Sequence, residues 1–236
     1  MDPDFRQDDR EKNMYIQWFG QSFFKITTKN EKGQEIILAI DPFDKSYGLK
    51  VPSKFGADIV LITHEHKDHN NIDLIKGTNL SQEPFIIAGA GEYEIKGVMI
   101  YGIPSFHDDK EGAERGENII YLLQIEDMWL AHLGDLGQKV LSDEQLEQLK
   151  NIDILMIPVG GVFTIDAKDG SNIVSQIEPR VIIPMHYKLP ELKLDIDGVD
   201  KFIKEQGLNP EQTEGRLKIV KKDLPSEETR LVIFNL

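Results

Sequence analysis

Residues 63–70 read Thr63-His64-Glu65-His66-Lys67-Asp68-His69-Asn70 and place three of the six histidines of this 236-residue chain within six positions. They follow residues 59–62, a continuous run of isoleucine, valine and leucine that is typical of a strand buried on both faces. The segment is therefore expected to be a loop at the carboxyl end of a buried strand. A solvated polar loop is the ordinary alternative, but the concentration of imidazole favours a metal site.

The spacing of these side chains suits two metal ions. In an extended segment His64 and His66 project to the same side, because side-chain direction repeats every second residue, so both can bind one ion. Asp68 and His69 come where the loop bends and can bind a second. Each divalent ion takes about four or five nitrogen or oxygen donors, with one position left for water. Other parts of the chain must therefore supply ligands.

Three further side chains occupy comparable places in the sequence. His107, Asp135 and His186 each come where an expected strand gives way to a polar or glycine-rich turn, in residues 104–108, 132–137 and 183–187. Cysteine is absent, so a thiolate site and a cysteine nucleophile are excluded. Imidazole and carboxylate donors favour zinc, although manganese and iron accept the same set.

This arrangement resembles that of the metallo-β-lactamase-fold hydrolases, whose pattern is HxHxDH, then a histidine, an aspartate after a strand, and a final histidine. The stretches 132–137 and 184–187, and Gly160-Gly161 with Thr164 and Asp166, are similar to the branch that contains L-ascorbate-6-phosphate lactonase and related zinc-dependent hydrolases. The resemblance extends from Tyr15 over nearly the whole chain. It implies an α/β fold, a four-layer αββα sandwich of two mixed sheets with helices on the outer faces.

The resemblance also implies roles for individual residues. The first metal would be bound by His64, His66 and His107, and the second by Asp68, His69 and His186, with Asp135 as a bridge. Asp68 and Asp135 are the expected catalytic residues, since Asp68 could orient the attacking hydroxide or accept its proton.

Two residues behind the ligands have alternative interpretations. Asp41 matches an acidic residue that supports the histidine loop by hydrogen bonding, although an ordinary turn aspartate before Pro42 explains it nearly as well. His132 lies three residues before Asp135, off the ligand face of a regular strand, which favours a structural or orienting role over direct catalysis.

Other positions bear on the substrate. Branch members often have histidine where this chain has Gln21 and Gln138, so the resemblance says less about specificity than about metal binding. Arg115 and Asn118 follow His107 and could contact an anionic substrate. Their charged neighbours favour a solvated loop instead.

The remaining pattern predicts a layered domain. Strands are expected at residues 15–19, 23–28 and 35–40 as an antiparallel meander, and later at 85–88, 93–95, 98–103, 119–125, 128–133, 154–159, 181–185 and 230–234. Helices are indicated by the capping box of Ser142 and Gln145, by an apolar stripe at 173–177, and by Asp197 as N-cap of a helix that ends at Gly207. Two blocks of strands followed by helices predict two sheets in one domain, 14–236, after a flexible arm, 1–13.

Composition restricts the partners. The formal charge of −14, from 41 acidic and 27 basic residues, disfavours tracking along nucleic acid or an anionic membrane. No run approaches the roughly twenty apolar residues of a membrane span, and no signal peptide is visible. A cytoplasmic location and a small-molecule substrate are expected. The oligomeric state is left open.

These observations predict a metal-dependent hydrolase. Two ions would lower the pKa of a shared water and so provide hydroxide near neutral pH. The expected substrate is a small ester, lactone or phosphoester, with or without a phosphate group. The alternatives are a ribonuclease or phosphodiesterase of the same fold, and a non-catalytic sensor of a metal or metabolite.

Overall fold

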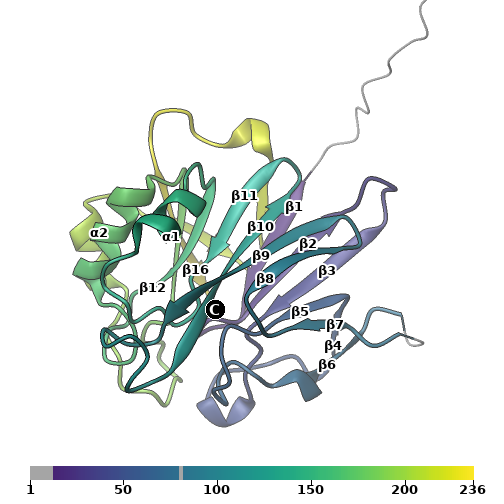
Figure 1. Ribbon diagram of the computed structural model, residues 1–236, viewed down its shortest axis with the longest axis horizontal. Helices are drawn as coiled ribbons and strands as arrows, with labels where there is room; N and C mark the ends of the chain where they lie inside the picture. Colours follow the sequence, from purple (N-terminus) through teal and green to yellow (C-terminus); the bar gives the residue numbers. More distant parts are fainter. Residues whose placement is uncertain (1–12, 80–81) are drawn as a thin grey trace, which may run out of the picture.

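The computed structural model describes residues 13–79 and 82–236, so the arm expected over residues 1–13 lies outside the described part except for Asn13. Two large β-sheets face one another, one of six strands and one of eight (Figure 1). Both sheets are mixed, with parallel and antiparallel neighbours. The predicted fold class is confirmed.

The six-stranded sheet has the order β15-β1-β2-β3-β5-β7. Its strands β1 (Met14–Trp18), β2 (Phe24–Lys29) and β3 (Glu35–Ile40) form the expected antiparallel meander. The short strand β5 (Ile59–Leu61) joins β3 in parallel, and β7 (Phe85–Ile87) and β15 (Leu217–Ile219) form the edges.

The eight-stranded sheet has the order β14-β16-β13-β12-β11-β10-β9-β8. Its members are β8 (Gly91–Ile95), β9 (Val98–Phe106), β10 (Glu117–Ile125), β11 (Met128–His132), β12 (Ile154–Pro158), β13 (Val181–Met185), β14 (Glu211–Glu214) and β16 (Arg230–Asn235). The sequence pattern missed β14 and β15, because β14 is polar along its length and β15 spans only three residues.

The two faces of the six-stranded sheet are covered differently. On β3, Leu38 and Ile40 join the core between the sheets, whereas Ala39 joins a second apolar cluster on the other face. This alternation follows from the period of two in a strand. The second cluster is closed by the short ribbon of β4 (Phe55–Ala57) and β6 (Ile75–Gly77) and by Leu192 and Ile196, near the 3₁₀ helices η1 (Lys45–Tyr47) and η2 (Ile72–Leu74).

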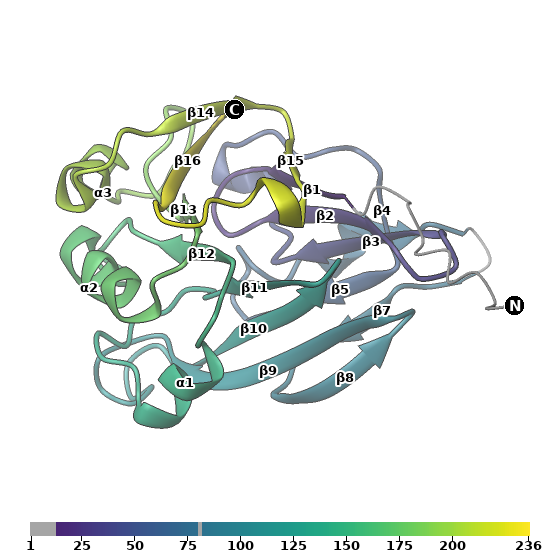
Figure 2. The same cartoon turned by 90° about the horizontal axis from the view of Figure 1, so that it is seen from above.

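The helices α1 (Asp143–Gln148), α2 (Ala167–Ile177) and α3 (Asp200–Gln206) gather beside the eight-stranded sheet (Figure 2). The predicted capping box of Ser142 and Gln145 is present at α1. Helix α2 ends two residues before Pro179. None of the helices in residues 13–79 and 82–236 combines the length and apolar character needed to cross a membrane.

The predicted N-cap of the third helix is wrong. Helix α3 begins at Asp200, after Val199, and has no side-chain cap. Asp197 is held in the preceding loop, where its N–H donates to Gly160 O and its carbonyl accepts from Lys188 N. These two tertiary contacts fix Asp197 away from the helix start, while its carboxylate pairs with Lys201. The predicted exit residue is correct, because Gly207 closes α3 in the left-handed conformation.

The topology brings distant strand ends to one place. Strands β11, β12 and β13 are parallel, and β9 runs the same way because it and β11 are both antiparallel to β10. Their carboxyl ends therefore meet at one edge of the sheet. His107, Asp135 and His186 follow β9, β11 and β13 within three residues, and His64 follows β5 in the facing sheet. Four segments far apart in sequence thus converge at one end of the sandwich.

Candidate metal centre

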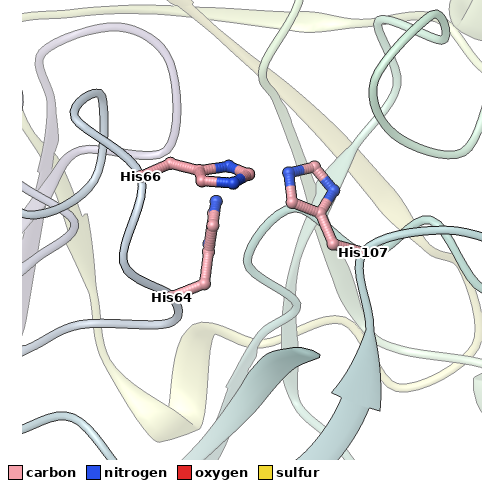
Figure 3. Close-up of side chains that lie close together, drawn as sticks. All are labelled: His64, His66 and His107. Carbon is pink, nitrogen blue, oxygen red and sulfur yellow. The ribbon is translucent and has the colours of Figure 1, made fainter. Parts of the chain in front are cut away.

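The seven predicted ligands form two groups. His64, His66 and His107 make one, and Asp68, His69, Asp135 and His186 make the other, with donor atoms within 4.8 Å of one another in each group. Figure 3 shows His64 and His66 reaching from one loop toward His107 on the opposite side. The groups adjoin, since the His64 and His69 ring centroids are 4.1 Å apart.

The histidine loop reaches this geometry in an unexpected way. Residues 63–65 bend rather than extend, and the chain then turns so that His69 N and Asn70 N both donate to His66 O. Strand alternation is therefore the wrong explanation for the pairing of His64 with His66. The rings still meet, with centroids 4.6 Å apart, because the bend brings them together.

A buried nitrogen atom of His64 fits a metal ion. His64 Nε2 is buried and has no hydrogen-bond partner among the described residues. An unsatisfied buried polar atom is costly, so such atoms in a native fold call for a partner. Divalent ions would supply one, and a donor set of imidazole and carboxylate suits them.

Asp41 lies directly behind the histidine loop. It is fully buried, its Oδ1 accepts from Thr63 N, and its Oδ2 accepts from Thr63 Oγ1 and lies 3.0 Å from His69 Nδ1. Thr63 Oγ1 lies in turn 3.0 Å from His64 Nδ1. Asp41 thus fixes one histidine of each group, which is the contact expected of a residue that orients metal ligands. It is not a simple turn aspartate.

Asp135 lies between the two groups. Its Oδ2 is 3.1 Å from both His69 Nε2 and His186 Nε2, and 3.8 Å from His107 Nε2. Ser22 Oγ donates to its Oδ1, and its backbone N–H donates to Asn118 Oδ1. This position is compatible with the predicted bridging role.

Burial and neighbouring charges favour the protonation states in which most of these side chains can bind a metal, an ionised carboxylate and a neutral imidazole. Burial would raise the pKa of Asp135, but His186 and His69 hold it well below its usual range, so the carboxylate is ionised. Burial lowers the pKa of His64, and neighbouring His69 lowers it further. Burial likewise lowers the pKa of His107. His69 differs: burial opposes its charge, yet Asp135 and Asp41 raise its pKa well above the usual value.

His132 supports the centre from behind. It is fully buried, its Nε2 donates to Ser22 O, and its Nδ1 accepts from Gly134 N. Ser22 in turn contacts Asp135 through its hydroxyl. Burial lowers the pKa of His132, so the ring is a neutral imidazole whose two nitrogens are both occupied. Both ring nitrogens of His132 therefore contact backbone groups, and neither contacts a predicted ligand.

A pocket of about 390 Å³ opens over the two groups. Its walls include the ligands His66, Asp68, His107, Asp135 and His186, and also Tyr47, Glu114, Arg115, Phe163 and Leu194. This volume suits a small molecule. Tyr47, Phe163 and Leu194 were not singled out from the sequence, because isolated aromatic and aliphatic residues give no local signal.

Comparison with known proteins identifies the family. A family model described as the β-lactamase superfamily domain matches residues 15–186. The chain belongs to the metallo-β-lactamase superfamily.

Relatives from archaea and bacteria match most of the chain. A UPF0173 metal-dependent hydrolase of Methanopyrus kandleri is 27% identical over 84% of this chain and 95% of its own length. A UPF0173 metal-dependent hydrolase of Lysinibacillus sphaericus is 30% identical over 77% of this chain and 89% of its own length. A crystal structure from Thermotoga maritima is named as a zinc-dependent hydrolase of the metallo-β-lactamase superfamily. It has a TM-score of 0.73 and 34% identity, and the match covers 94% of this chain and 98% of that one. The chain is therefore a metal-dependent hydrolase of this superfamily.

The two glutamines Gln21 and Gln138 lie in different surroundings. Gln21 is fully buried and its Nε2 lies 3.3 Å from His186 Nε2, whereas its Oε1 has no hydrogen-bond partner among the described residues. Gln138 donates to Val140 O and Gln145 Oε1 and only holds the loop before α1. Of the two glutamines, only Gln21 contacts a predicted ligand.

The expectations for Asn118 were both wrong. Asn118 is fully buried at the start of β10, where its Nδ2 donates to Ser105 Oγ and Leu133 O. It therefore neither lies in a solvated loop nor faces a substrate, and instead holds the backbone of Asp135. Arg115 does line the pocket.

Replacing Gln21 with leucine is expected to weaken metal binding about tenfold, in the range seen for residues that contact metal ligands. Leucine removes the amide beside His186, while Gln21 O still accepts from Trp18 Nε1 and His186 N. Competition with a chromophoric chelator measures the affinity. Gln138→Leu is the matched control and should leave it unchanged. Unaltered affinity in Gln21→Leu would mean that the amide only fills space.

Proposed function

We propose that this superfamily member hydrolyses a small ester, lactone or phosphoester with the help of two divalent metal ions, of which zinc is the first choice. One observation supports this most: seven side chains with nitrogen or oxygen donors form two adjoining groups, and five of the seven line one pocket. His64, His66 and His107 would hold one ion. Asp68, His69 and His186 would hold the other, with Asp135 shared between them.

Two bound ions would acidify a shared water and so supply hydroxide near neutral pH. Asp68 is the ligand best placed to orient that nucleophile or accept its proton, because its side chain is 17% exposed and lines the pocket. Asp135 is buried, so its role is to hold the two groups together. Tyr47, Phe163 and Leu194 would exclude bulk water from the reacting bond.

The test is metal content followed by turnover. Protein loaded with zinc, manganese or iron is assayed on bis-p-nitrophenyl phosphate and on a panel of lactones and aryl esters. We expect about two ions per chain and hydrolysis of at least one lactone or ester that EDTA abolishes and added metal restores. Turnover of the phosphodiester alone would favour the nuclease-like alternative. A fully loaded protein that hydrolyses nothing would favour a sensor and overturn the proposal.

A further inference from the structure

Arg115 is the single cationic side chain among the described residues that line the metal pocket. It belongs to the loop after His107 and shares the lining with Tyr47 and Leu194. The whole chain carries an excess of acidic residues, and Asp68, Glu114 and Asp135 also line this pocket. General solubility does not explain why an arginine lies in the lining of a pocket with several acidic side chains.

The loop that carries Arg115 is held in one shape by Asp108. This buried carboxylate accepts hydrogen bonds from the backbone N–H groups of Lys110, Gly112, Glu114 and Arg115, at 2.7–2.9 Å. Burial would raise the pKa of Asp108, but these four donors lower it to about 2. Asp108 directly follows His107, so the same turn that presents a predicted ligand also fixes the position of Arg115.

The guanidinium group has unused donors. Arg115 Nη2 donates to Val162 O at 3.1 Å, and the group lies 5.6 Å from the centroid of the Phe163 ring. No carboxylate among the described residues forms an ion pair with the guanidinium group. The neighbouring carboxylate of Glu114 pairs with Lys110 instead. Arginine has five N–H donors in a planar fork that matches carboxylate and phosphate oxygens. Most of these donors remain available to a ligand.

Two exposed apolar residues lie beside Arg115. Val162 and Phe163 are 61% and 36% exposed, although both are hydrophobic. An exposed apolar pair beside an arginine, at the rim of a pocket, is typical of a binding surface. A ligand seated there would place an apolar body against Phe163 and Leu194 and a negative charge against Arg115.

We propose that Arg115 binds an anionic group of the substrate, a carboxylate or a phosphate, while the scissile bond lies over the two ligand groups. The inference rests on the proposed hydrolysis and narrows its substrate class to small esters or lactones that carry a negative charge. Phe163 and Leu194 contact the apolar part between the charge and the reacting bond. Asp108 is a positioning residue, because it acts through the backbone of Arg115.

Binding of matched acids tests the proposal without turnover. Pentanoate and glutarate have the same carbon chain, but glutarate carries a second carboxylate; a series from malonate to adipate varies the span. Titration calorimetry of the metal-loaded protein at low salt should show one dicarboxylate binding about tenfold to hundredfold tighter than the monocarboxylate of its length. Arg115→Met should remove this gain and leave the monocarboxylate affinity unchanged, and Arg115→Lys should retain part of it.

Lys139→Met is the control, since it removes an exposed positive charge that pairs with Asp109 of the same loop, and neither residue lines the pocket. It should keep the full gain. The proposal is overturned if no dicarboxylate gains over its monocarboxylate, if the gain survives in Arg115→Met, or if Lys139→Met loses it equally. A parallel titration with 4-phosphonobutyrate shows whether phosphate or carboxylate is preferred. Because these titrations measure binding only, absence of hydrolysis would count against the proposed function and not against the anion site.

Discussion

Asp135→Ala is expected to remove metal and activity together. The native carboxylate reaches His69 and His186 at 3.1 Å and His107 at 3.8 Å, so it contacts both ligand groups. Its loss should reduce metal content from about two ions per chain to one or fewer. The rate on any probe that the native protein hydrolyses should fall at least about a thousandfold, since removal of one group that stabilises charge already lowers rates by about a hundredfold to a thousandfold.

Companion variants make this result interpretable. His66 is exposed, so His66→Ala should leave the fold intact and release only the ion of the three-histidine group. Asp109→Ala removes an exposed carboxylate that pairs with Lys139 and should change neither metal content nor rate. Elemental analysis after dialysis gives the stoichiometry, and circular dichroism checks folding. Unchanged metal content in Asp135→Ala and in His66→Ala would show that these residues are not metal ligands and would contradict the proposed metal centre.

Replacing Asp41 should damage both stability and metal binding. Asp41→Ala leaves Thr63 N–H, Thr63 O–H and His69 Nδ1 without their buried acceptor, at a cost of about 3 kcal/mol or more. Asp41 also adopts a left-handed backbone with φ +51, which alanine accommodates less well than asparagine. We therefore expect Asp41→Ala to lower Tm by roughly 6–12 °C, as thermal denaturation of the metal-free protein would measure.

Asp41→Asn separates the charge from the shape. It keeps the backbone preference and one acceptor oxygen, but it faces the donors of Thr63 and His69 with an amide NH₂. We expect a smaller loss of Tm and a metal affinity that falls about tenfold to hundredfold. Asp73→Asn, an exposed change in η2, should alter neither quantity. Native metal affinity in Asp41→Asn would show that the carboxylate does not orient the ligands.

The seven predicted ligands owe their recognition to local patterns. Three histidines and an aspartate within six residues, and single polar residues just past apolar runs, are visible without any knowledge of pairing. The structure brings these seven together because parallel strands end at one edge. The predicted start of α3 was wrong because a tertiary contact overrides the local pattern. Asp197 is a typical N-cap residue, but its backbone hydrogen bonds to Gly160 and Lys188 decide its conformation.

The sequence by itself determined the metal-binding character of the chain, its alternation of strands and helices, and most strand positions, because each depends on residues close together along the chain. Only the tertiary structure decided which side chains contact the ligands from behind and which face the pocket. Ser22 meets Asp135 across 113 positions, and Gln21 meets His186 across 165. Such contacts depend on how the two sheets pack, and no pattern within a window of the sequence encodes that packing.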